Sequence, residues 1–327
     1  MEVALCPFLR VRAHGHLVAS QPSDYNRLTL RLPPRVRRTG IIDPHIMPWK
    51  ADFTSPGLSL LPVGICAFCW EIAFRVVSLA IIILLLSQPS IVLPGGNRER
   101  LQKRGGTYAI AILHAGVISV RGAMHALALY SAPAVVQLQQ PIIGAVDDPW
   151  YEVTAAVEWT NLLFFSWLAY DLAHILYEYP TLGGGDKVAH HVVMLAASFI
   201  CGKHRILPIV LAWLMVGEVA STAFNCRFFF LATGRKNSDG FRRANYLHAV
   251  LHILGRIVLY AAGLLHLWTA RVQVLALADT DAISRPRLLG LLSVLGCGFA
   301  FNVASLESIV SKARGATSTT SRKDKHA

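Results

Sequence analysis

The stretch Leu60–Leu86, LLPVGICAFCWEIAFRVVSLAIIILLL, carries only two charged residues, Glu71 and Arg75. A helix needs roughly 20 predominantly apolar residues to cross the ~30 Å hydrocarbon core of a bilayer, and this stretch is longer than that. Its apolar residues run on without alternating with polar ones, which favours a helix over a strand of a membrane barrel. Glu71 and Arg75 lie one helical turn apart and are able to neutralise each other. The stretch therefore predicts a transmembrane helix.

Six more apolar segments follow, separated by turns rich in proline and glycine. The fourth segment is short and lies at the lower margin of a spanning length. The sequence thus predicts an all-α polytopic membrane helical bundle of about seven transmembrane helices. The predicted spans are Leu60–Leu86, Tyr108–Tyr130, Val153–Tyr177, Val188–Cys201, Ile206–Leu231, Ala244–Trp268 and Leu288–Val310.

The composition of the 327 residues agrees with this class: 54% are hydrophobic and 15% are charged. About a quarter of the residues of an ordinary soluble domain are charged, so this chain lacks the charges for a water-facing surface. Its net charge of +12 is spread over the loops, which gives no argument for nucleic acid as a partner. Six scattered cysteines do not form the framework of a small secreted domain.

The chain is predicted to have four parts. Residues 1–57 form a basic arm that we expect to be disordered, with an organellar presequence or a lipid-binding arm as alternatives. Residues 58–107 hold the first transmembrane helix and a basic loop, residues 108–311 the main membrane domain, and residues 312–327 a basic tail.

The loop charges predict the orientation of the bundle. The loops Asn97–Arg104 and Gly234–Arg243 are basic, as is the tail, whereas Ser131–Glu152 contains acidic residues and no Lys or Arg. Because basic loops remain in the cytosol, the C-terminus is predicted to be cytosolic. Two features disagree with this alternation: Lys203 with Arg205, and the basic residues within residues 1–50. The span count and the side of the N-terminus therefore stay open.

Polar side chains recur at helical spacing within the spans, and ionisable groups at membrane depth usually face the bundle interior. Stripes of this kind are expected to line a polar interior, although interhelical hydrogen bonds alone would also explain them. The stripes are Glu218, Ser221, Thr222 and Asn225; His248, His252, Arg256 and Tyr260; His114, Arg121 and His125; Asp171 and His174; and Asp186 and His190.

An ordered set of motifs resembles a known family. Tyr170-Asp171-Leu172, Tyr179-Pro180, Gly185-Asp186-Lys187 and His190-His191 resemble the TLC domain of translocating-chain-associated membrane proteins, ceramide synthases and the ceroid-lipofuscinosis protein. The run from Glu218 to Arg227 is similar to the E-x-x-S-T-x-F-N-x-R pattern of less studied TLC-domain transmembrane proteins. The resemblance covers about Tyr108–Val310.

The resemblance implies a role with membrane lipids. Ceramide synthases are N-acyltransferases that use acyl-CoA, and His190 and His191 match the first half of their motif. Gly217-Glu218 stands where those enzymes have a His-Asp pair, which favours the lipid-homeostasis branch over a ceramide synthase. A third reading is a cargo or assembly factor without chemistry. We expect no metal and no cofactor, with acyl-CoA as a candidate co-substrate and membrane lipids as partners.

The basic tail predicts where the protein is located, and the polar stripes predict a site. Lys323 and Lys325 resemble a dilysine retrieval signal, which predicts the endoplasmic reticulum membrane. One polar pocket inside the bundle, opening toward the cytosolic leaflet, is expected to bring together Asp171, Asp186, His190, His191 and Glu218. The catalytic candidates are His190, His191, Asp171, Asp186 and Glu218, and the substrate-binding candidates are His114, Ser221, Asn225, His252 and Arg256.

Two other classes fit less well. A di-iron hydroxylase needs about eight histidines in HxxxH and HxxHH boxes, and only His248–His252 has the first spacing within the spans. A transporter built from inverted repeats would show paired interrupted helices. Pro208 and Gly217 hint at one interruption in the fifth span, but no repeat accompanies it.

Overall fold

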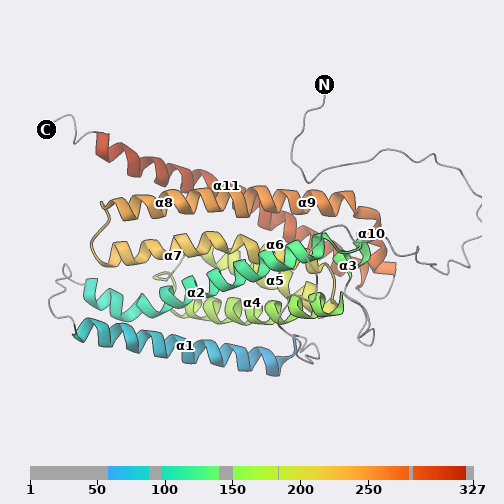
Figure 1. Ribbon diagram of the computed structural model, residues 1–327, viewed down its shortest axis with the longest axis horizontal. Coiled ribbons are helices and arrows are strands. Elements are labelled where there is room, and N and C mark those ends of the chain that lie inside the picture. The colour runs from blue at the N-terminus through green and yellow to red at the C-terminus, as the bar shows by residue number, and fades with distance from the viewer. Residues whose placement is uncertain (1–57, 88–96, 140–149, 183, 280–282, 322–327) are drawn as a thin grey trace, which may run out of the picture. The chain divides into compact units, whose positions relative to one another are not determined.

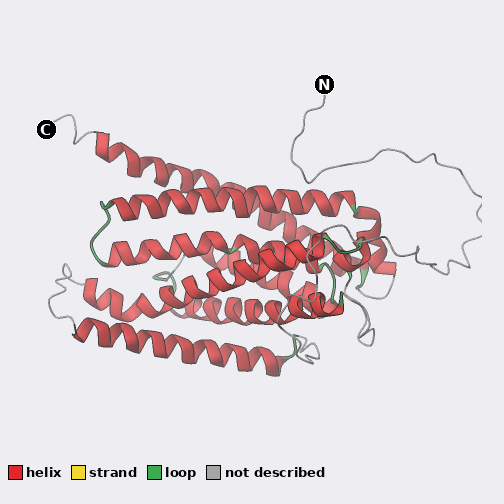
Figure 2. Cartoon of the chain, viewed as in Figure 1, coloured by secondary structure: helices red, strands yellow, loops and turns green. Residues whose placement is uncertain are grey.

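The computed structural model describes residues 58–87, 97–139, 150–182, 184–279 and 283–321. All of them lie in the second of two units into which the chain divides, residues 44–327. The described residues form helices and no strand, which confirms the predicted all-α class (Figures 1 and 2). The helices are α1 (Leu60–Ser87), α2 (Asn97–Tyr130), α3 (Ala134–Leu138), α4 (Tyr151–Tyr177), α5 (Gly185–His204), α6 (Pro208–Gly217), α7 (Val219–Ala232), α8 (Asp239–Leu251), η3 (His252–Val258), α9 (Leu259–Thr269), α10 (Arg271–Ala276), η4 (Leu277–Asp279) and α11 (Arg285–Ser321).

The described residues include five helical runs that are long and apolar enough to cross a membrane: Leu60–Leu85, Arg98–Tyr130, Pro208–Ala232, Asp239–Thr269 and Arg285–Ser311. The chain is therefore a polytopic membrane protein. The third and fourth predicted spans correspond to α4 and α5, which are long helices but do not meet the same criterion. A total of seven spans stays a prediction, as do the domain boundaries.

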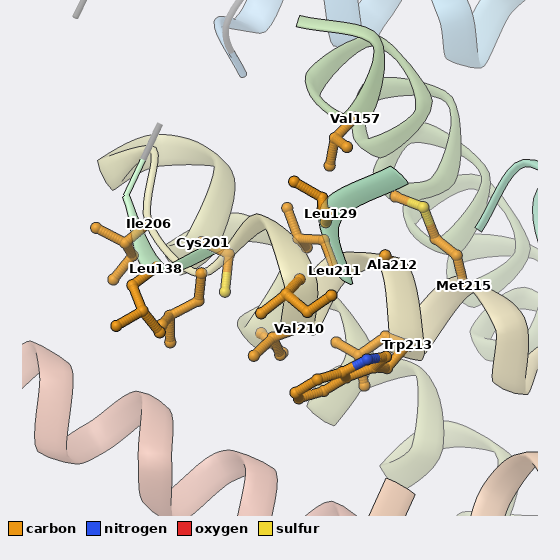
Figure 3. Close-up of a cluster of buried hydrophobic side chains, with 14 of the residues drawn as sticks. Leu129, Leu138, Val157, Cys201, Ile206, Val210, Leu211, Ala212, Trp213 and Met215 are labelled. Carbon is orange, nitrogen blue, oxygen red and sulfur yellow. The ribbon is translucent and has the colours of Figure 1, made fainter. Parts of the chain in front are cut away.

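The short helix α6 occupies the centre of the bundle. Its residues Pro208–Met215 and Gly217 are all buried, and it packs against α2, α4, α5 and α9. Figure 3 shows the core around it, where Leu211 and Met215 lie among side chains of the surrounding helices. Around this centre α1 packs on α2 and α4, α4 on α5, α5 on α11, α11 on α8, and α8 on α7 (Figure 1).

The outer helix α1 has the opposite character. It leaves large apolar side chains exposed along its length, among them Phe68, Val76 and Ile83. Such a long exposed apolar surface is unusual in a soluble protein but suits contact with lipid tails. The bundle thus has an apolar coat as well as an apolar core.

A glycine brings α2 into close contact with α6. A side chain at Gly122 would place its Cβ 2.6 Å from Met215 Cβ and 2.9 Å from the carbonyl oxygen of Ala212. Only glycine allows the two backbones to approach so closely. This contact fixes the end of α6 against α2, close to Gly217.

Two irregular helical segments face each other beyond this point. The fifth predicted span is interrupted at Glu218, between α6 and α7, and the sixth contains the π-helix η3. A Cβ at Gly255 of η3 would lie 3.6 Å from the Cα of Gly217, so the two backbones are close together. Breaks and π-helical segments free backbone groups for other partners and are frequent at functional sites.

Candidate functional site

Asp171 near the end of α4 and His191 in the first half of α5 form a buried pair. The two residues are 5% and 6% exposed, and Oδ2 of Asp171 lies 2.9 Å from Nε2 of His191. The other ring nitrogen, Nδ1, lies 2.9 Å from the carbonyl oxygen of Lys187, one turn earlier. The ammonium group of Lys187 is itself 3.6 Å from Asp171 Oδ2.

These contacts leave His191 without a free lone pair. The carbonyl oxygen of Lys187 is only an acceptor, so Nδ1 must donate to it. Nε2 either donates a hydrogen bond to the Asp171 carboxylate or accepts one from the carboxylic acid. In both arrangements neither nitrogen is able to accept a proton from a substrate, so His191 is held as a fixed partner of Asp171.

His190 lies beside a second carboxylate. Its Nε2 is 3.6 Å from Oε1 of Glu218, which is 6% exposed at the break between α6 and α7. This separation is longer than a normal hydrogen bond, so the ring of His190 is less firmly held than that of His191. The ring of His190 is therefore the less constrained of the two.

Arg256 of η3 holds Glu218 in place. Its guanidinium lies 3.0 Å from Glu218 Oε1, donates to Ser221 Oγ at 2.7 Å, and donates through Nε to the carbonyl oxygen of Gly217 at 3.2 Å. Ser221 in turn donates to Glu218 Oε2 at 2.9 Å. The carboxylate therefore has partners on both oxygens, which offsets the cost of burying it in the bundle.

His114 of α2 lies at the edge of this polar cluster. It is 2% exposed and stacks on Trp167, with ring centroids 4.8 Å apart. It lies within electrostatic range of Glu218, Asp171 and His191, and its Nε2 has no hydrogen-bond partner among the described residues. This nitrogen is a candidate contact for a ligand group.

The structure brings together most of the predicted site residues. We call the set of Asp171, His190, His191, Glu218, Ser221 and Arg256 the histidine–carboxylate cluster. Helices α4, α5, α7 and η3 and the residue between α6 and α7 contribute to it. Within it, Glu218 contacts Arg256 and His190.

Besides His114 at its edge, three predicted residues lie outside this cluster. Asp186 is exposed in the first turn of α5, and no contact with the cluster is seen. His252 is buried, but its Nε2 bonds the carbonyl oxygen of Asn302 in α11 at 3.1 Å. Asn225 is buried two turns further along α7. Their predicted roles stay predictions.

The sequence did not single out two neighbours of the cluster. Lys187 supplies both a carbonyl oxygen and an ammonium group, and its place in the Gly185-Asp186-Lys187 motif was the available signal. Tyr170 donates to Glu71 of α1 at 2.8 Å, a contact between distant segments that spacing alone does not reveal.

The described residues also show one apolar hollow. It is small and lies outside the cluster, lined by Val210, Trp213, Leu214, Tyr260, Leu264, Leu267 and Leu295. Within the part of the chain that the structure describes, no three His, Cys, Asp or Glu side chains are grouped so as to hold a metal ion. The described geometry offers histidine, carboxylate and guanidinium groups for proton transfer or for binding a polar headgroup.

A comparison with protein-family models matches the TLC domain over residues 109–303. This range contains every residue of the histidine–carboxylate cluster and nearly coincides with the predicted range. A comparison with curated proteins finds no match. Because the matched range covers more than half of the chain and holds the motifs described above, this polytopic membrane protein belongs to the TLC-domain family.

Proposed function

We propose that this protein acts in lipid homeostasis by binding or modifying a membrane lipid at the histidine–carboxylate cluster. The observation that carries the proposal is the pairing of two consecutive histidines with two separate carboxylates inside an apolar bundle. Buried ionisable groups of this kind are costly in a membrane and usually mark a functional site. The lipid headgroup would meet the cluster, and the tails would lie along the apolar helices.

The geometry supports distinct roles for the two histidines. His190 would accept a proton or a hydrogen bond from the headgroup, because its ring is loosely held by Glu218. His191 would keep Asp171 and the start of α5 in position. Arg256 would stabilise negative charge on Glu218 or on a ligand group.

Ceramide-synthase-like N-acyl transfer is the alternative function. In that reaction the nitrogen of a sphingoid amine bonds to the thioester carbonyl carbon of acyl-CoA, and the carbon–sulfur bond breaks. His190 would take the proton from the attacking nitrogen and pass it to the departing thiolate. The glycine at position 217, where those enzymes have histidine, removes one of their expected groups.

The proposal also includes a location for the protein in the cell. We place the protein in the endoplasmic reticulum membrane with a cytosolic C-terminus, on the strength of the Lys323 and Lys325 signal and the loop charges. Both lysines lie outside the described residues.

As a second alternative, a cargo or assembly factor would use the cluster only to hold the helices together.

Lipidomics of cells that lack the protein tests the proposal. Wild-type protein should restore the lipid profile, and the double variant His190→Ala/His191→Ala should fail to do so at normal abundance. His204→Ala is the matched control, since it lies on the same helix at its far end. Full rescue by the double variant would favour the assembly role and overturn the proposal.

A further inference from the structure

Arg227 of α7 is a half-buried cation without an acidic partner. Among the described residues no carboxylate lies within ion-pair distance of its guanidinium, and its Nε is shielded from solvent without a hydrogen-bond acceptor. Arg256, by contrast, pairs with Glu218, and Arg121, which also lacks a carboxylate partner, donates through Nε to the hydroxyl of Thr160. Removing a charged group from water costs free energy unless an anion lies close enough to neutralise it.

Two aromatic rings hold this guanidinium at the seam between α7 and α8. It lies 5.4 Å from the ring centroid of Phe224 on its own helix and 5.9 Å from that of Phe241 on α8. Phe241 is buried, whereas Phe224 is 44% exposed, so the seam has an open side. Cation–π contacts orient a guanidinium without neutralising its charge. The terminal nitrogens therefore remain available to an anion that approaches from the open side.

The depth of Arg227 suits the phosphate level of a bilayer. It precedes the end of α7 at Ala232 by five residues, which is about 8 Å along the helix axis. The loop that follows carries the exposed residues Arg235 and Lys236, and Arg243 is exposed near the start of α8. A basic membrane edge of this kind attracts anionic lipids.

We propose that Arg227, held between Phe224 and Phe241, binds the phosphate group of an anionic membrane lipid. Arginine suits this ligand because its planar donors match two phosphate oxygens at once. None of the three residues belongs to the histidine–carboxylate cluster, so the proposed site is separate from the proposed function. The occupant would be a lipid that binds the outside of the bundle, with its tails along α7 and α8.

Binding of phosphatidic acid to the purified full-length protein tests this site. The protein is placed in nanodiscs of phosphatidylcholine with increasing phosphatidic acid, and bound lipids are counted by native mass spectrometry. Arg227→Gln should weaken phosphatidic acid binding by about tenfold or more, the size expected for a lost charge-assisted hydrogen bond. Arg235→Gln is the matched control, because it removes the same charge from the same end of the bundle without an aromatic cradle.

The two variants distinguish a specific phosphate site at Arg227 from general attraction by the basic membrane edge. Equal losses in both variants would mean that net charge alone attracts the lipid, and this would overturn the proposal. Unchanged binding by Arg227→Gln would overturn it too. Arg227→Lys keeps the charge and removes the planar fork, so intermediate binding at an unchanged melting temperature supports the site. Competition by millimolar inorganic phosphate that abolishes lipid binding would assign the site to a soluble phosphate instead.

Discussion

His190 and His191 are consecutive residues whose rings stand 86° apart with centroids 5.5 Å from each other, so each meets a different carboxylate. Glu218 lies beside His190, and Asp171 beside His191. Adjacent positions on a helix point about 100° apart, which is why one His-His pair is able to contact two neighbouring helical segments. The two histidines are therefore not equivalent.

Single substitutions should separate these two histidines. His191→Ala would leave the buried Asp171 with only the ammonium of Lys187, so we expect a loss of about 2–4 kcal/mol in unfolding free energy. His190→Ala leaves Glu218 with Arg256 and Ser221, so its cost should be about 1 kcal/mol or less. Denaturation in detergent measures both, and lipidomic rescue should fail for His190→Ala even where abundance is normal. Equal destabilisation by the two variants would contradict their different roles.

The contact between Glu218 and Arg256 should show a large coupling energy. Both side chains are mostly buried, and the guanidinium also bonds Ser221. A double-mutant cycle of Glu218→Gln and Arg256→Gln should give about 1.5–3 kcal/mol. The pair Glu99–Lys103 supplies the control cycle, because both of its side chains are exposed and should couple by about 0.5 kcal/mol or less. A coupling energy no larger than that of the control would show that burial does not strengthen the ion pair between Glu218 and Arg256.

Two glycines of α2 should respond differently to the same substitution. Gly122→Ala places a Cβ 2.6 Å from Met215 Cβ and should destabilise the protein by about 1–3 kcal/mol, because α2 and α6 must separate. Gly116→Ala meets nothing within 4 Å, so it should be neutral or stabilise by up to about 1 kcal/mol. Melting temperatures of the two variants provide the measurement. A neutral result at Gly122 would show that the close contact is easily relaxed.

The basic ends of the helices predict the orientation in the membrane. A tag after Ala327 and a tag in the Gly234–Arg243 loop should both be digested by protease in sealed microsomes, because basic segments face the cytosol. A tag within Ser131–Glu152 serves as the protected control. Protection of the C-terminal tag would reverse the predicted orientation.

The spans could be predicted because membrane helices are distinguished by their length and apolarity. Predicted and observed ends of the first helix agree within a residue, at Leu60–Leu86 and Leu60–Ser87. The second helix begins earlier than predicted, at Asn97, because its first turns are basic and so carry no apolar signal. The last helix likewise continues to Ser321, past the predicted end at Val310.

The partners within the site could be predicted only in part. Helical spacing placed Glu218 and Ser221 on one face, and the structure joins them directly. Spacing within one helix does not say which neighbour it will meet, so the pairing of Glu218 with His190 could not be derived. The π-helix that carries Arg256 was not predicted, because its residues follow the same apolar pattern as the rest of the sixth span.

Arg256 bonds the Gly217 carbonyl and the Glu218 carboxylate with one guanidinium. The first bond replaces a partner that the backbone loses where α6 ends, and the second neutralises a charge. A rigid planar group cannot leave one of these neighbours without disturbing the other. We therefore expect that a ligand which competes with Glu218 for the guanidinium also weakens the hydrogen bond to Gly217, at the break between α6 and α7.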